Sequence, residues 1–195
     1  MIAFTKRQDQ IIDASLKIIN QVGVQYYTIK RLAAEIEVTE GAIYKHFESK
    51  DAILESIIRY GQDNVNEIVE EIRQTEGTNL ELLRHVFLER CKHHPEDRTL
   101  AAFVGIYNAI RNHLDLKPQA NRVIDTFFDE IKRIIQEGQR VGEIRSDIAA
   151  DSLFQTFVGA LHFLLDEWQR HAYKTDLQKQ SKAMWADLEA FLTKK

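Results

Sequence analysis

Apolar side chains recur every three or four residues along most of this chain, which is the spacing of helices that bury one face. The first stripe consists of Ile11, Ala14 and Ile18. Thr5 precedes the stripe and Gly23 follows it, and these residue types commonly begin and end helices. The pattern predicts a first helix between Thr5 and Gly23.

Two short helices are predicted next, joined by a tight turn. Thr28 is suited to cap the second helix, which reaches Ile36, and the third helix lies within residues 39–50. Ile43 and Phe47, four residues apart, would dock the third helix and leave its polar side chains facing outward. Such a helix-turn-helix places its second helix in the major groove of DNA.

The rest of the chain also shows a helical pattern, so we expect an all-α fold. Only two prolines and eight glycines occur in 195 residues, which favours long helices over a sheet with many turns. Ser49 is suited to cap a long fourth helix. Further helices are predicted over residues 80–92, 100–112 and 119–140, from Asp147 to residue 171, and over residues 177–192.

Two of the later helices, residues 119–140 and the helix that opens at Asp147, carry apolar side chains on more than one face. A helix with one face exposed to solvent does not need this pattern, so we expect each of these two helices to pack on its own chain and on a second copy. The residues expected at the dimer seam are Phe128, Ile135, Phe154, Val158, Leu165 and Trp168.

Charge and cysteine content narrow the function classes. The formal net charge of −4 argues against a protein that coats nucleic acid without specificity. Residues 1–50 hold seven Lys and Arg against six Asp and Glu, so this part is the less acidic one.

Cys91 is the only cysteine, which excludes an intrachain disulfide and fits a reducing compartment. Because no apolar signal segment or long uncharged stretch is visible, we expect a cytoplasmic protein.

The most specific motif is the run Tyr44-Lys45-His46-Phe47-Glu48-Ser49-Lys50. Together with Gly23, Thr28 and Gly41, this run resembles the tetracycline-repressor (TetR) family of transcriptional regulators. The family usually has Gly in the turn between the two short helices, where this chain has Glu37. A residue other than glycine in a left-handed turn costs about 1 kcal/mol, so the substitution affects the rigidity of the turn and not the motif.

The resemblance implies two domains. Residues 1–50 would form a helix-turn-helix DNA-binding domain, and residues 51–195 a ligand-binding and dimerisation domain. No linker rich in Pro, Gly or Ser separates them, so we expect the boundary to fall inside the fourth helix.

Matching positions and side-chain chemistry assign roles in DNA binding. Residues expected to hold phosphates, which fixes register without reading sequence, are Thr28, Tyr44, His46 and Lys50. Residues expected to face base edges are Thr39, Glu40, Gly41, Ala42 and Lys45, and Lys30 is a candidate for either role. A plain helical hairpin explains Lys50 poorly, because Lys50 stands at a helix start, where the helix dipole disfavours a cation.

Aromatic side chains from several helices form the remaining signal. Core packing explains any one of them, but the family resemblance implies a ligand cavity among these helices, suited to a small apolar or amphipathic effector. The residues expected to line it are Phe87, Cys91, Phe103, Tyr107, Phe127, Phe157 and Leu161.

Metal binding and catalysis are disfavoured. A Cys and His cluster near residues 85–97 does not lie on one helical face and is interrupted by Pro95, so we favour surface histidines near a helix end over a metal site. No nucleophile elbow, phosphate loop or paired catalytic carboxylate motif occurs in the sequence, and we expect neither an enzyme nor a bound cofactor.

We therefore expect a cytoplasmic homodimer with no membrane partner, and the family resemblance implies that it binds palindromic operator DNA and represses until its effector binds. The alternative from another class is a helical adaptor that binds proteins and not DNA.

Overall fold

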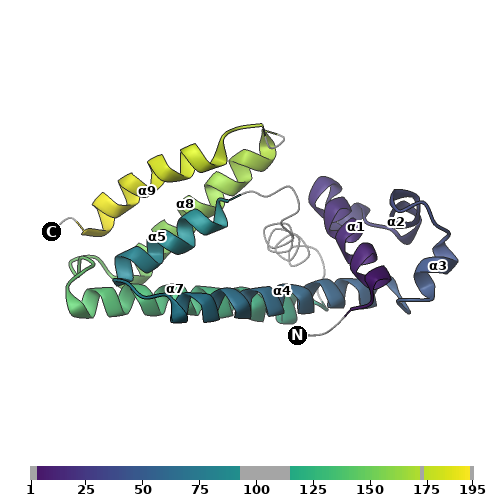
Figure 1. Ribbon diagram of the computed structural model, residues 1–195, viewed down its shortest axis with the longest axis horizontal. Helices are drawn as coiled ribbons and strands as arrows, with labels where there is room; N and C mark the ends of the chain where they lie inside the picture. Colours follow the sequence, from purple (N-terminus) through teal and green to yellow (C-terminus); the bar gives the residue numbers. More distant parts are fainter. Residues whose placement is uncertain (1–3, 93–114, 172–173, 194–195) are drawn as a thin grey trace. The chain divides into compact units, whose positions relative to one another are not determined.

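The computed structural model describes residues 4–92, 115–171 and 174–193, and every regular element in these ranges is helical (Figure 1). The described residues form two compact units. The first unit lies within Met1–Glu67 and Glu96–Thr126, and the second lies within Ile68–Pro95 and Phe127–Lys195. The all-α prediction is confirmed, whereas the helix predicted over residues 100–112 lies outside the described residues.

The first helix of the first unit, α1, spans Lys6–Val22 and has the predicted ends. Thr5 and Gln8 form a capping box, in which each side chain accepts from the main-chain N–H of the other residue. Gly23, at φ 85°, ends the helix with a backbone conformation that other residues adopt at a cost.

A short 3₁₀ helix, η1 (Val24–Tyr26), leads into α2 (Ile29–Glu35) and α3 (Glu40–Tyr44). The hydroxyl oxygen of Thr28 caps α2, and that of Thr39 caps α3. Figure 1 shows α2 and α3 beside α1, with α2 packed on α1 and α3 packed on α2.

Two long helices take part in both units. α4 spans Lys50–Gln74, and Ser49 caps it as predicted, because its hydroxyl oxygen accepts from Ala52 N–H at 3.0 Å. α7 spans Lys117–Val141 and ends at Gly142, at φ 81°. Since α4 is continuous, one helix includes residues of both units.

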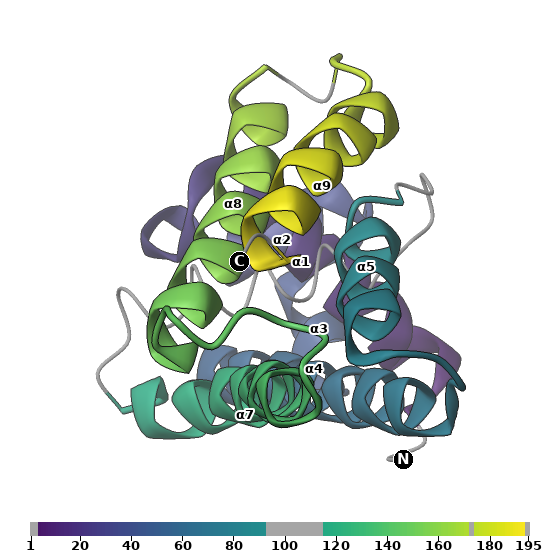
Figure 2. The same cartoon turned by 90° about the vertical axis from the view of Figure 1, so that its left-hand side faces the viewer.

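The second unit is completed by α5 (Asn79–Arg90), α8 (Ala150–Arg170) and α9 (Leu177–Thr193). α9 packs on both α5 and α8, and Figure 2 shows it between them. None of the described helices is long and apolar enough to cross a membrane.

The predicted opening of α8 at Asp147 is wrong, because the helix begins at Ala150. The Asp147 carboxylate accepts from Nε and Nη2 of Arg145 at 2.7 and 2.6 Å. This ion pair uses the side chain that would otherwise have capped the helix.

Candidate nucleic-acid interface

The docking of α3 decides which of its side chains face outward. Ile43 is fully buried and Phe47 is 6% exposed, so these two anchor the segment as the sequence predicted. Tyr44 between them is 50% exposed. The helix ends at Tyr44, and Lys45 and His46 follow as an exposed turn at its end.

The turn between α2 and α3 is sharp because Glu37 adopts φ 55°, the left-handed conformation expected there. Glu37 is the one residue other than glycine with positive φ in the part of the chain that the structure describes. The main-chain N–H of Val38 donates to Ala33 O at 2.9 Å across this turn. These contacts set the angle at which α3 follows α2.

All ten residues predicted to contact DNA lie in the first unit. Eight of them are exposed, namely Thr28, Lys30, Thr39, Glu40, Gly41, Tyr44, Lys45 and His46, while Ala42 and Lys50 are half-buried. The Thr28 and Thr39 hydroxyl oxygens accept the N–H groups of Arg31 and Ala42, at 3.1 and 3.2 Å. Each hydroxyl proton therefore stays available to donate to a phosphate oxygen.

Gly41 is not required by the packing of α3. A Cβ added there would meet only Thr39 Oγ1, at 3.9 Å, which is ordinary contact. The glycine instead leaves the outer surface of α3 bare, so that another backbone or a base edge fits close to its main chain.

The cations of this surface differ in their partners. Lys17, on α1, is paired with Glu35 at 2.5 Å. Lys30, Lys45 and Lys50 have no carboxylate partner among the described residues. Their charges are therefore available for an anionic ligand, and the N-terminal N–H groups of α4 beside Lys50 favour an anion at the same place.

Two contacts that the sequence pattern did not predict tie this surface together. The Nε2 amide of Gln8 donates to the main-chain oxygen of His46 at 3.4 Å, which links the start of α1 to the end of α3. The Lys50 ammonium nitrogen lies 5.5 Å from the centre of the Tyr27 ring, which is fully buried. Tyr27, directly before the Thr28 cap, was the signal that sequence reasoning could have used, since side chains alternate along an extended segment and Thr28 faces outward.

The second unit brings together part of the predicted ligand site. The rings of Phe87 and Phe157 pack edge to face, with centres 5.6 Å apart, and Trp185 lies 5.9 Å from Phe87. Cys91 is buried beside Ser181, and burial raises the pKa of its thiol to about 12. Trp185 was not predicted, and its buried indole N–H has no hydrogen-bond partner among the residues that the structure describes.

The remaining predicted ligand residues are spread more widely. Phe127 on α7 and Leu161 on α8 are buried, and Phe127 lies 6.4 Å from Phe128. Phe103 and Tyr107 fall outside the described residues.

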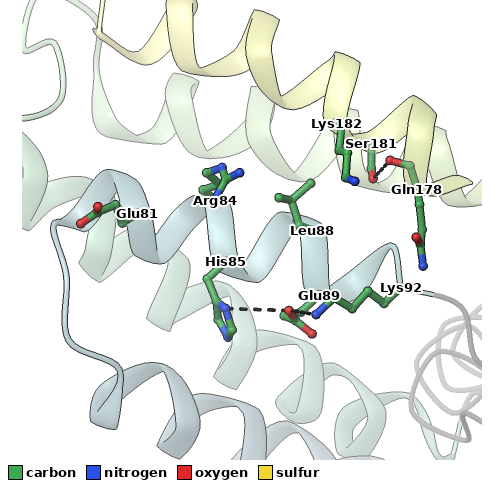
Figure 3. A pocket seen from close by; sticks show the side chains of 9 residues that line it. All are labelled: Glu81, Arg84, His85, Leu88, Glu89, Lys92, Gln178, Ser181 and Lys182. Atoms are coloured by element: carbon green, nitrogen blue, oxygen red, sulfur yellow. Dashed lines mark hydrogen bonds and ion pairs between the residues drawn. The ribbon is translucent and has the colours of Figure 1, made fainter.

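An open groove of about 260 Å³ lies between α5 and α9 (Figure 3). Figure 3 shows Arg84 on α5 and Lys182 on α9 directed into it. Glu89 is paired with Lys92 there, and Glu81 caps α5 at Thr78, so both acids have partners. Arg84 and Lys182 add positive charge to the groove, although Arg84 also interacts electrostatically with Glu81, and the two cations make this surface suited to an anionic group.

The described residues contain no group of three or more metal-ligating side chains. His85 instead pairs with Glu71, its Nε2 lying 3.1 Å from the Glu71 carboxylate.

The six residues predicted at a dimer seam differ in burial. Ile135, Trp168, Leu165 and Phe154 are between 0% and 9% exposed within a single chain, whereas Phe128 and Val158 are half-buried. On the outer side of α8, Phe163 is 57% exposed, and a Cβ added at the nearby Gly159 would meet nothing within 4 Å.

Comparison with known proteins finds a matching family model for each of the two parts of the chain. Residues 11–57 match the model of bacterial regulatory proteins of the tetR family, and residues 60–189 match the C-terminal region of YsiA-like proteins. The fatty acid metabolism regulator protein of Bacillus subtilis is 25% identical over 168 residues, which cover 86% of each chain.

Two solved structures share the fold. The transcriptional regulator FadR from Bacillus subtilis, in complex with stearoyl-CoA, has a TM-score of 0.73 and 23% identity over 93% of this chain and 97% of its own. The ketosteroid transcriptional regulator KstR2 of Mycobacterium tuberculosis has a TM-score of 0.82 and 17% identity over 99% and 98%.

Proposed function

As a member of the TetR family, this chain is a DNA-binding transcriptional regulator, and we propose that it is a dimeric repressor released from a palindromic operator by an amphipathic acyl thioester. The family match favours DNA-binding regulation over the alternative of an adaptor that does not bind DNA. The observation that carries the proposal is the exposed surface of α3, beside which Lys45 and Lys50 have no carboxylate partner within the described ranges of the chain. We assign residues 1–50 to DNA binding and residues 51–195 to effector binding and dimerisation in a cytoplasmic protein.

In this proposal the exposed residues of the helix-turn-helix have different roles in DNA binding. Tyr44 and His46 would donate to phosphates beside Thr28, and Lys50 would meet a phosphate at the start of α4. Lys45 would reach guanine acceptors, and Glu40 would accept from cytosine. Lys30 and Thr39 flank these positions and are exposed. Ala42, which is half-buried, would contact a thymine methyl group.

We propose that the dimer forms through α7 and α8. An exposed Phe163 beside the bare surface of Gly159 supports a seam on the outer side of α8, because a large exposed aromatic is typical of an interface. Phe128 and Val158 are the half-buried members of the predicted set and would extend this seam.

The effector class rests on two features of the second unit. The cluster of Phe87, Phe157 and Trp185 supplies an apolar environment. The indole N–H of Trp185, which has no partner in the described part of the chain, is suited to donate to a carbonyl oxygen. The groove with Arg84 and Lys182 supplies charge for an anionic head group. An acyl-CoA combines an apolar chain, a thioester carbonyl and phosphates, and one structural neighbour was solved with stearoyl-CoA.

Release of DNA requires the effector to prefer the conformation that does not bind operator. The change would pass through α4, which is continuous between the two units, and alter the separation of the two helix-turn-helix motifs in the dimer. Effector and operator must then weaken each other's binding by the same factor.

The test is fluorescence anisotropy with duplexes tiled across the region upstream of the gene for this chain. Wild type should bind one duplex tightly, and stearoyl-CoA should release it, while free coenzyme A and stearate should act weakly. If no duplex is bound better than scrambled DNA, the repressor proposal is wrong. If stearoyl-CoA and coenzyme A have equal effects, the effector class is wrong and the DNA-binding part stands.

A further inference from the structure

Tyr27 is held in place beneath the Lys50 ammonium group by contacts on its other side. Its hydroxyl oxygen lies 2.7 Å from Ser15 Oγ, and Ser15 donates its own proton to Ile11 O at 2.6 Å. Tyr27 must therefore be the donor to Ser15. Burial raises the pKa of the Tyr27 hydroxyl despite this hydrogen bond, so the ring remains neutral.

The local backbone explains why Tyr27 points inward while the next residue, Thr28, points outward. Tyr27 and Thr28 both adopt extended conformations, at φ −74° and ψ 119° and at φ −134° and ψ 152°. Successive side chains of an extended segment point to opposite sides. Thr28 is accordingly exposed while Tyr27 is fully buried, and Tyr26, the last residue of η1, is 63% exposed.

The distance of 5.5 Å from Lys50 Nζ to the centre of the Tyr27 ring lies within the range of about 6 Å for cation–π attraction. A free lysine side chain loses rotamer entropy when it binds a ligand. The ring restricts the ammonium group without neutralising it, whereas a carboxylate partner, such as Glu35 for Lys17, would compete with a phosphate.

We propose that Tyr27 is a positioning residue for DNA binding, which holds the Lys50 ammonium group ready at the start of α4 for an operator phosphate. The inference rests on the proposed DNA binding. One side of the ammonium group faces the ring, and the Ser49 cap fixes the main chain from which Lys50 extends, since Ser49 Oγ accepts from Ala52 N–H at 3.0 Å. The phosphate would approach from the solvent side of the half-buried Lys50.

A double-mutant cycle separates positioning from a merely structural role. Tyr27→Leu should weaken binding to specific and scrambled duplexes by about two- to fivefold in each half-site. The same substitution in a Lys50→Ala background should change neither affinity, because the cation it acts through is gone. Equal losses in both backgrounds would overturn the proposal, since Tyr27 would then serve the fold alone.

A second series avoids truncating a buried side chain. Tyr27→Phe removes the hydroxyl group and keeps the ring, so DNA binding should stay near that of wild type while thermal stability falls with the loss of the Ser15 hydrogen bond. Fluorinated phenylalanines at position 27 keep nearly the same shape but weaken the negative ring face. The dissociation constant should rise with each added fluorine, and this trend should vanish in the Lys50→Ala background. A flat series in the presence of Lys50 would contradict the proposal, and failure of wild type to bind any DNA would instead contradict the proposed function.

Discussion

The side-chain amide of Gln8 donates to the main-chain oxygen of His46 at 3.4 Å, so the capping box of α1 is tied to the end of α3. Gln8 thereby has two functions that substitution separates. Its Oε1 accepts from Thr5 N–H at 3.0 Å, which a glutamate would also do, while only the amide donates to His46.

Gln8→Glu should therefore keep α1 stable and weaken operator binding, because the end of α3 loses a fixed contact. Thermal melting should stay close to that of wild type, and anisotropy should show a several-fold loss of operator affinity, about 1 kcal/mol for one lost hydrogen bond. Gln10→Glu adds the same charge two residues away and is the control. Equal losses of affinity in both variants would mean that charge alone, and not the tie to His46, is responsible.

Gly41→Ala should stabilise the fold and weaken operator binding. Since the added Cβ meets only Thr39 Oγ1, at 3.9 Å, the free energy of unfolding should rise, by about 0.5 to 1 kcal/mol at most. Operator affinity should fall about tenfold, because a methyl group in a close contact costs about 1 to 3 kcal/mol. Urea denaturation and anisotropy on the same sample give both values. Unchanged operator affinity would place Gly41 outside the interface.

Glu130 predicts a pH-dependent contribution to stability in the second unit. It is 2% exposed and accepts from Arg73 and Arg133, at 2.8 and 2.6 Å. Burial would raise the pKa of this carboxyl, but the hydrogen bonds from the two guanidinium groups outweigh it, and the pKa lies below its ordinary value of 4.5. The stabilisation is thus fully present above the unfolded pKa and is lost as pH falls through the folded one.

Glu130→Gln should lower the free energy of unfolding by about 1.5 to 3 kcal/mol at pH 7, the range for hydrogen bonds to charged groups. The difference from wild type should shrink as the pH falls below 4.5. Glu137→Gln, on the same helix with the exposed partner Arg140, is the control and should have a much smaller effect. A Glu130→Gln effect that is independent of pH would show that packing, and not charge, accounts for it.

Phe163→Glu should yield monomers. Phe163 is 57% exposed on one chain, so the substitution should leave each chain folded and place a charge at the proposed seam. Phe154 is a poorer choice, because it is buried within the chain and a charge there would disturb folding. Sedimentation velocity at micromolar concentration is the measurement, with Gln180→Glu on α9 as the control. A wild-type monomer, or a dimeric Phe163→Glu protein, would rule out this seam.

The sequence predicted the elements that local signals determine. Thr5 and Gly23 bound α1, and Glu37 adopts the left-handed turn, because caps and turns depend on a few neighbouring residues. The same reasoning failed at Asp147, where an ion pair with Arg145 competes with capping.

Contacts between distant residues could not be predicted in this way. Tyr27 and Lys50 are separated by two helices and a turn, and Gln8 meets His46 only after α3 has docked. Trp185 likewise joins Phe87 through the packing of α9 on α5, which a helical pattern does not specify.

In the proposed complex Lys50 holds a phosphate while Lys45 reads bases, and a salt titration of binding to operator and scrambled duplexes tests these roles most directly. Lys50→Ala should weaken both complexes and reduce the slope of log affinity against log salt by about one unit per lost phosphate contact. Lys45→Ala should cost about 1 to 3 kcal/mol on operator and little on scrambled DNA. If Lys50→Ala instead weakens operator binding alone while Lys45→Ala weakens both duplexes equally, the roles assigned to these two cations are reversed.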